Sequence, residues 1–278
     1  MASHEKELPA IRACIFDLDG LLINSEDIIT KALNQLLEKY ERPTFTPSVR
    51  SKLMGVHDSS NGDVFHDWAR LPIPREQWAR ESRAHMQLLF RDCEPMPGAE
   101  KLLFNLSSAR SSSPGDKIEL ALASSTTSDI YALKTSRPET ERLLGFFQPE
   151  RRIFGDDPRL RKGRRKPAPD LYLLALDVLN STVDRCEEPI KANECLVFED
   201  SAVGVEAGRR AGMRVIWVPH PDVAVEYEAR QKDILAGRTG LFDAGDDQQP
   251  GEIDDGWAES IPSLEQFNYD KYGISVPS

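Results

Sequence analysis

Short apolar runs that end in polar residues recur along the chain, and helix-length stretches separate them. The apolar residues within each run are continuous rather than alternating, which is typical of strands buried on both faces. Strands that alternate with helices predict a parallel α/β sheet. The expected strands are residues 11–16, 119–123, 152–154, 195–198 and 214–218, and the expected helices between them include residues 169–179 and 204–211.

One long segment interrupts this alternation directly after the first strand. Residues 27–96 carry apolar side chains at helical spacing, and the sequence 95–98, Pro-Met-Pro-Gly, prevents a helix from continuing at the exit. We therefore expect a helical cap at 27–96, inserted between a first core segment at 1–26 and a second at 97–278. A stretch rich in Gly, Asp and Gln at 237–256 predicts a flexible acidic loop.

Composition narrows the class of protein. The chain has 278 residues, 40% hydrophobic and 29% charged, with a mean hydropathy of −0.46, which is typical of a soluble globular protein. The net charge of −11 argues against binding to nucleic acid, whose backbone attracts basic surfaces. The apolar runs are too short to span a bilayer, and residues 1–9 lack the apolar stretch of a secretion signal. The four cysteines are scattered, without the paired spacing of a zinc or redox site. We expect a cytoplasmic protein with no membrane partner.

The first candidate site residues are Asp17 and Asp19, on a tight turn at the end of the first strand. In parallel sheets ligands bind at the carboxyl ends of strands, so both carboxylates are in a suitable place. Two close carboxylates repel each other unless a cation neutralises one of them, and Mg²⁺ prefers such oxygen ligands. An ordinary Asp-Gly turn is the alternative interpretation.

A second acidic pair, Glu199 and Asp200, follows another apolar run. By itself such a pair is more often a helix N-cap with favourable charge near the helix dipole. If the two acidic strand ends are adjacent in the sheet, however, Asp200 completes the magnesium site that Asp17 and Asp19 begin.

Two further clusters suit a phosphate group. Ser124 and Ser125 close the second expected strand, where hydroxyl and backbone N–H groups can bind phosphate oxygens, although a serine N-cap fits equally well. Lys166 can neutralise charge on a nucleophile and a phosphate together. The alternative interpretation, a lysine exposed to solvent, is strong. Lys166 ends a basic run of residues 161–166, and most such runs are solvated.

Taken together, these motifs resemble the haloacid dehalogenase-like hydrolase superfamily. Four spaced motifs in this order (Asp-x-Asp-Gly, strand-end serine, Lys-Pro and Glu-Asp) are a specific signal, and the likeness covers nearly the whole chain. It implies a Rossmann-like core, a parallel sheet with helices on both faces, and an inserted α-helical cap. The segments that resemble the branch containing pseudouridine-5'-phosphatase are residues 20–26, 134–137, 155–158, 198–200 and 263–267.

The resemblance also implies roles for the acidic residues. Asp17 would be the nucleophile that forms an aspartyl-phosphate, and Asp19 the acid/base that protonates the leaving alkoxide and later activates water. Asp17, Asp200 and the backbone carbonyl of Asp19 would hold Mg²⁺, and Glu199 would support the site.

Ser124, Ser125 and Lys166 would bind the transferring phosphoryl group. The branch usually has Gly directly before its Lys-Pro pair, whereas here Arg164 and Arg165 intervene, which puts the placement of Lys166 in question.

The expected activity is a phosphatase, acting as a monomer on a small phosphomonoester that is nucleotide-like or a sugar monophosphate. A sugar-phosphate mutase is the main rival, because related mutases share all four core motifs, and a non-catalytic phosphate-binding protein is the other alternative. We expect substrate choice to lie in the cap, where Gly55, His57 and Asn61 form a polar stretch.

Overall fold

A six-stranded sheet, in which every neighbouring pair is parallel, forms the centre of the molecule. The computed structural model describes residues 8–46, 49–50, 58–112, 117–182, 188–240 and 251–277. The predicted parallel α/β sheet is confirmed, and an edge strand, β7, extends it beyond the five expected strands. In spatial order the strands are β4 (Arg152–Ile153), β3 (Glu119–Ala123), β1 (Ala13–Phe16), β5 (Cys195–Glu199), β6 (Arg214–Trp217) and β7 (Ala258–Ser260).

Helices follow most of these strands, and a small antiparallel sheet lies outside the main one. Its two strands are β2 (Arg110–Ser111) and β8 (Ile274–Ser275). The α-helices are α1 (Ser25–Lys39), α3 (Asp58–Ala69), α4 (Arg75–Leu89), α5 (Ala99–Ser108), α6 (Ser128–Lys134), α7 (Pro138–Leu144), α8 (Asp170–Thr182), α9 (Ala202–Arg210), α10 (Pro221–Glu226) and α11 (Gln231–Leu235). Short 3-10 helices are η1 (Phe90–Asp92), η2 (Pro149–Arg151), η3 (Ala192–Glu194), η4 (Glu228–Arg230), η5 (Leu264–Gln266) and η6 (Asp270–Tyr272).

Helices cover both faces of the sheet, which explains why the central strands are apolar throughout. Successive side chains of a strand point to opposite faces. In β1, Ala13 and Ile15 belong to an apolar cluster with α8 and α9, whereas Cys14 and Phe16 belong to a cluster with α5 and α7. All four are fully buried. Both faces of this central strand are therefore covered by helices.

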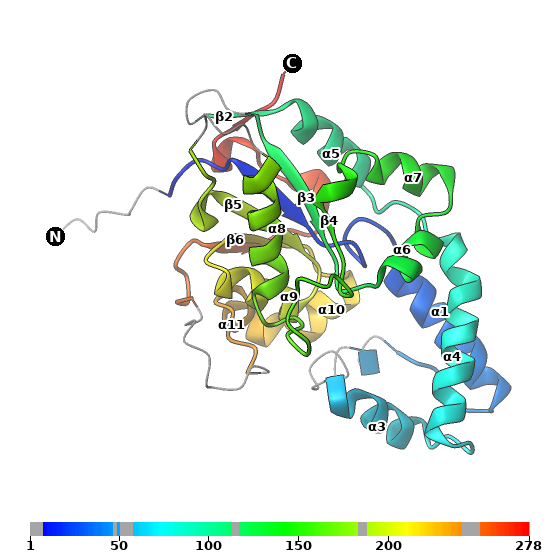
Figure 1. The fold of residues 1–278 in the computed structure, drawn as a ribbon. Helices are drawn as coiled ribbons and strands as arrows, with labels where there is room; N and C mark the ends of the chain where they lie inside the picture. Colours follow the sequence, from blue (N-terminus) through cyan, green and yellow to red (C-terminus); the bar gives the residue numbers. More distant parts are fainter. Residues whose placement is uncertain are drawn as a thin grey trace.

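The segment between β1 and α5 forms a helical insertion, made of α1, α3, α4 and η1, that lies to one side of the sheet (Figure 1). It has an apolar cluster of its own, in which the rings of Phe65 and Trp78 stack 5.4 Å apart and Leu37 is fully buried. The domain boundaries expected at residues 26 and 96 remain a prediction, with α1 beginning at Ser25.

The two connections of the insertion run side by side and are hydrogen bonded to each other. The Asn24 N–H donates to the Glu94 carbonyl at 3.0 Å, and the Met96 N–H donates to the Leu22 carbonyl at 2.9 Å. Ile23 also bridges to the turn at Asp19. Both connections of the insertion therefore lie next to the turn that follows β1.

The predicted acidic loop falls largely on residues 241–250, which lie outside the described residues. Before it, α11 packs against α9, with Ile234 buried. Within the described ranges, no helix is both long and apolar enough to cross a membrane.

Phe16→Ala tests the packing of the sheet. Phe16 is fully buried and stacks on Phe198 with ring centroids 4.5 Å apart, so its truncation should lower the free energy of unfolding by about 3–5 kcal/mol. The same truncation of Phe104, which is 63% exposed on α5, should change it by less than about 0.5 kcal/mol. Urea unfolding of both variants measures the difference. Equal losses would contradict this assignment of the core.

Candidate active site

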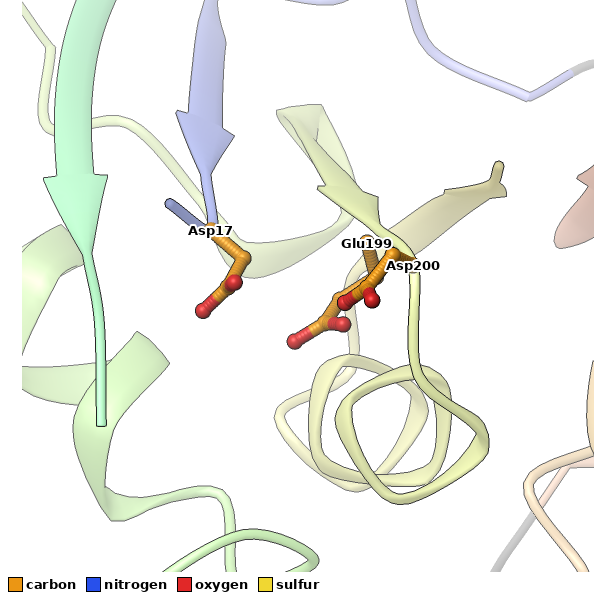
Figure 2. Close-up of side chains that lie close together, drawn as sticks. All are labelled: Asp17, Glu199 and Asp200. Atoms are coloured by element: carbon orange, nitrogen blue, oxygen red, sulfur yellow. The ribbon is translucent and has the colours of Figure 1, made fainter. Parts of the chain in front are cut away.

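Three carboxylates meet at the carboxyl ends of two neighbouring strands in the middle of the sheet. Asp17 directly follows β1, Glu199 is the last residue of β5, and Asp200 comes next. The strands pair with Phe16 opposite Phe198, and the Asp17 N–H donates to the Phe198 carbonyl at 3.0 Å. One oxygen from each carboxylate lies within 4.8 Å of the other two (Figure 2). The register of the sheet thus assembles the acidic group where ligands bind in folds of this type.

Lys166 lies between two of these carboxylates. Its Nζ donates to Asp17 Oδ1 and to Glu199 Oε1, each at 2.6 Å, and the lysine side chain is only 7% exposed. Glu199 also accepts from the Tyr172 hydroxyl at 2.7 Å and from the backbone and hydroxyl of Ser201 at 3.0 Å. Both oxygens of Glu199 therefore already have donors, which favours a supporting role for this residue.

The two arginines before Lys166 do not keep the lysine from the acidic group. Arg164 turns back toward α8, where its Nε lies 3.1 Å from Asp170 Oδ2. The longer loop thus accommodates the departure from the branch pattern and still delivers the Lys166 ammonium to Asp17.

The electrostatics of the acidic group follow from its burial. Burial raises the pKa of Asp17 to about 7, although Lys166 acts in the opposite direction. Burial, followed by the charges of Glu199 and Asp17, raises the pKa of Asp200 well above its ordinary value. Burial would also raise the pKa of Glu199, but the charge and hydrogen bond of Lys166 hold it below its ordinary value. Lys166 alone therefore leaves the group with excess negative charge.

A divalent cation fits this excess of charge. Among the described residues, no side-chain donor pairs with the Asp200 carboxylate, so its oxygens remain available beside Asp17. Gly20, whose φ is +75°, leaves room for the Asp200 carboxylate. A Cβ at this residue would lie 2.3 Å from Asp200 Oδ2 and would clash with it. Buried carboxylate oxygens are the donors that Mg²⁺ takes in proteins. The residues present fit the predicted ion.

The Asp19 side chain turns to other partners. Its Oδ1 accepts from the Ser25 hydroxyl and from Lys134 Nζ, the latter at 2.6 Å. The acidic group consists of Asp17, Glu199 and Asp200, so any contact of Asp19 with the metal rests, as predicted, on its backbone carbonyl. Sequence reasoning assigned no role to Lys134, Ser25 or Tyr172. Ser25 and Lys134 each gave a signal, because both lie in segments that resemble the phosphatase branch, whereas Tyr172 gave none.

The serines lie at the carboxyl end of β3, the other neighbour of β1. Ser124 is fully buried, and its Oγ accepts from the Thr126 N–H at 3.2 Å, so it is not the N-cap of α6. Ser125 is exposed and, with Lys166, lines a cavity of about 450 Å³. This volume suits a small organic molecule. Phosphate binding by these serines stays a prediction.

The polar stretch expected to choose the substrate cannot be placed. Gly55 and His57 lie outside the described residues, as does the side chain of Asn61.

Comparison with known proteins agrees with this geometry. The family model described as haloacid dehalogenase-like hydrolase matches residues 14–218, which include every site residue predicted from the sequence. The chain belongs to the haloacid dehalogenase-like hydrolase family. Its resemblance to this family, inferred from four motifs, is confirmed.

Similar proteins extend the likeness over almost the whole chain. A Saccharomyces cerevisiae protein named a probable pseudouridine-5'-phosphatase is 35% identical over 268 residues, covering 95% of this chain and 98% of that protein. A Drosophila melanogaster protein of the same name is 34% identical over 232 residues, covering 83% and 91%. The fold matches that of a Deinococcus radiodurans family hydrolase crystallised with phosphate and sodium (TM-score 0.59, 21% identity, 85% of this chain and 99% of that one). The chain is accordingly a phosphomonoester hydrolase.

Stability of the metal-free protein should depend on pH in a direction set by Asp17. Its carboxyl ionises near 3.8 when unfolded but at about 7 when folded, so the native state binds more protons between these values. The free energy of unfolding should therefore fall as pH rises through this window. Mg²⁺ held by the ionised carboxylates should raise the unfolding temperature more at about pH 8 than at about pH 5.

Thermal unfolding with chelator and with excess Mg²⁺ measures both effects. Asp17→Asn is the control. Because an amide does not ionise, this variant should show a weaker dependence of the free energy of unfolding on pH. A rise in metal-free stability through this window that Asp17→Asn abolishes would contradict the assignment.

Proposed function

We propose that this chain is a magnesium-dependent phosphatase that hydrolyses a small phosphomonoester, nucleotide-like or a sugar monophosphate, through an aspartyl-phosphate on Asp17. One observation carries the proposal: Asp17 lies at the carboxyl end of a central strand, 2.6 Å from the Lys166 ammonium and within 4.8 Å of Asp200. A nucleophile, a fixed positive charge and a further oxygen ligand thus converge on one point.

In the first step, a carboxylate oxygen of Asp17 attacks the phosphorus, and the bond from phosphorus to the leaving oxygen breaks. The carboxylic acid of Asp19 gives its proton to that oxygen, so the alcohol leaves neutral. In the second step, the Asp19 carboxylate takes a proton from water, whose oxygen attacks the phosphorus and releases inorganic phosphate and Asp17.

Lys166 keeps Asp17 in place for attack and offsets charge on the phosphoryl oxygens in both steps. Glu199 in turn holds Lys166, because its own oxygens are bonded to Tyr172 and Ser201. Mg²⁺, held by Asp17, Asp200 and the backbone carbonyl of Asp19, would supply positive charge to the phosphoryl group.

The substrate class rests on likeness to named proteins and on charge. Two similar proteins carry the name pseudouridine-5'-phosphatase, which favours a nucleotide-like monophosphate. The net charge of −11 favours a free small molecule over a nucleic acid.

Asp17→Asn tests the nucleophile. An amide cannot form the phosphoenzyme, so phosphate release from p-nitrophenyl phosphate should fall by more than about 10³-fold. Circular dichroism should show an unchanged fold. Asp177→Asn, which makes the same change at an exposed position on α8, should keep wild-type activity. Wild-type turnover by Asp17→Asn would refute the mechanism.

A phosphate-release screen across nucleoside, sugar and polyol monophosphates tests the substrate class. We expect release from a nucleoside or sugar monophosphate, lost on chelation and restored by Mg²⁺. Interconversion of sugar phosphates without free phosphate would instead identify a mutase. Binding without turnover of any compound would identify a non-catalytic protein.

A further inference from the structure

The Asp19 carboxylate lies where the helical insertion joins the sheet. It is bonded to Ser25, the first residue of α1, and to Lys134, the last residue of α6. The Lys134 ammonium also lies 4.7 Å from the ring centroid of Phe90, in η1 at the other end of the insertion. Asp19 and Lys134 therefore contact both ends of the insertion as well as the core.

Lys134 is an unusual residue for this position. Its side chain is only 5% exposed, and a buried ammonium is costly unless it is paired. Besides Asp19, the donor contact of its Nζ is Thr126 Oγ1 at the long distance of 3.5 Å. Asp19 is thus its principal partner. The site contains two such pairs, because Lys166 is bonded to Asp17 in the same way.

The two donors share one oxygen of Asp19. Ser25 and Lys134 both bond to Oδ1, and no hydrogen bond joins Oδ2 to any described residue. Two donors on one oxygen hinder rotation of the carboxyl group, whose terminal torsion is otherwise broad. The Asp19 side chain is 19% exposed, so the carboxyl group is still accessible to a substrate.

We propose that Lys134 is a positioning residue that, together with Ser25, fixes the Asp19 carboxyl group so that Oδ2 exchanges the proton with the leaving oxygen and with water. The inference rests on the proposed phosphatase function, in which Asp19 is the acid/base. It also makes that orientation depend on how the insertion is seated, since Ser25 and Phe90 belong to its two ends. A merely structural Lys134 would tie α6 to the insertion without affecting proton transfer.

A positioning role and a merely structural role for Lys134 predict different dependences of activity on the leaving group. An alkyl phosphate needs protonation of its leaving oxygen, whereas p-nitrophenyl phosphate releases a stable anion with little help. Lys134→Met should therefore lower kcat for an alkyl phosphate by about 10²-fold or more, and for p-nitrophenyl phosphate by only a few-fold. Lys101→Met is a matched control on the exposed face of α5, and both rates should stay unchanged.

A double-mutant cycle with Asp19→Asn shows whether Lys134 acts through Asp19. If it does, adding Lys134→Met to Asp19→Asn should cause little further loss with the alkyl phosphate. Should Lys134→Met unfold below the assay temperature, Lys134→Gln, which keeps a donor, provides the same comparison with a smaller loss. Ser25→Ala should shift the ratio of the two rates in the same direction.

Equal losses of Lys134→Met on both substrates, no loss at all, or full additivity with Asp19→Asn would each overturn the inference. These results differ from failure of the proposed function, which would appear as a wild-type enzyme without phosphatase activity or an active Asp17→Asn variant.

Discussion

The ion pair of Lys166 with Asp17 and Glu199 is the interaction on which the acidic end of the sheet depends. Three carboxylates are buried there, and removing even one charge from water is costly without a partner. Lys166 offsets part of that cost, and the hydroxyls of Tyr172 and Ser201 hold Glu199 in place. Because this compensation is incomplete, the three carboxylates keep an excess of negative charge, which fits the proposed Mg²⁺.

The position of this site follows from the topology of the sheet. The chain adds β3 and β4 on one side of β1 and then β5, β6 and β7 on the other, so β1 lies where the strand order reverses. Loops that follow adjacent strands diverge there and leave an opening. The insertion begins directly after the turn at Asp19, and its entry contributes Ser25. The turn at Asp19 and the insertion are therefore neighbours both in sequence and in space.

Much of this arrangement was predictable, for physical reasons. The central strands are buried on both faces, so their apolar runs were visible, and the polar residues that end them marked Asp17, Ser124 and Asp200. The edge strand β7 was not predicted, because its three residues are only half-buried and include Glu259 and Ser260. Lys134 escaped because it ends a short helix, and the reach of its side chain to Asp19 depends on tertiary packing that no local pattern encodes.

The separate apolar cluster of the insertion bears on how such enzymes diversify. Leu37, Phe65 and Trp78 pack among residues of the insertion itself, while its paired connections fix it at one place. Substitutions in this outlying cluster can therefore change the packing of the insertion without disturbing the strands that carry the acidic group. In the proposed phosphatase, the part of the molecule expected to choose the substrate can therefore vary independently of the part expected to carry the reaction.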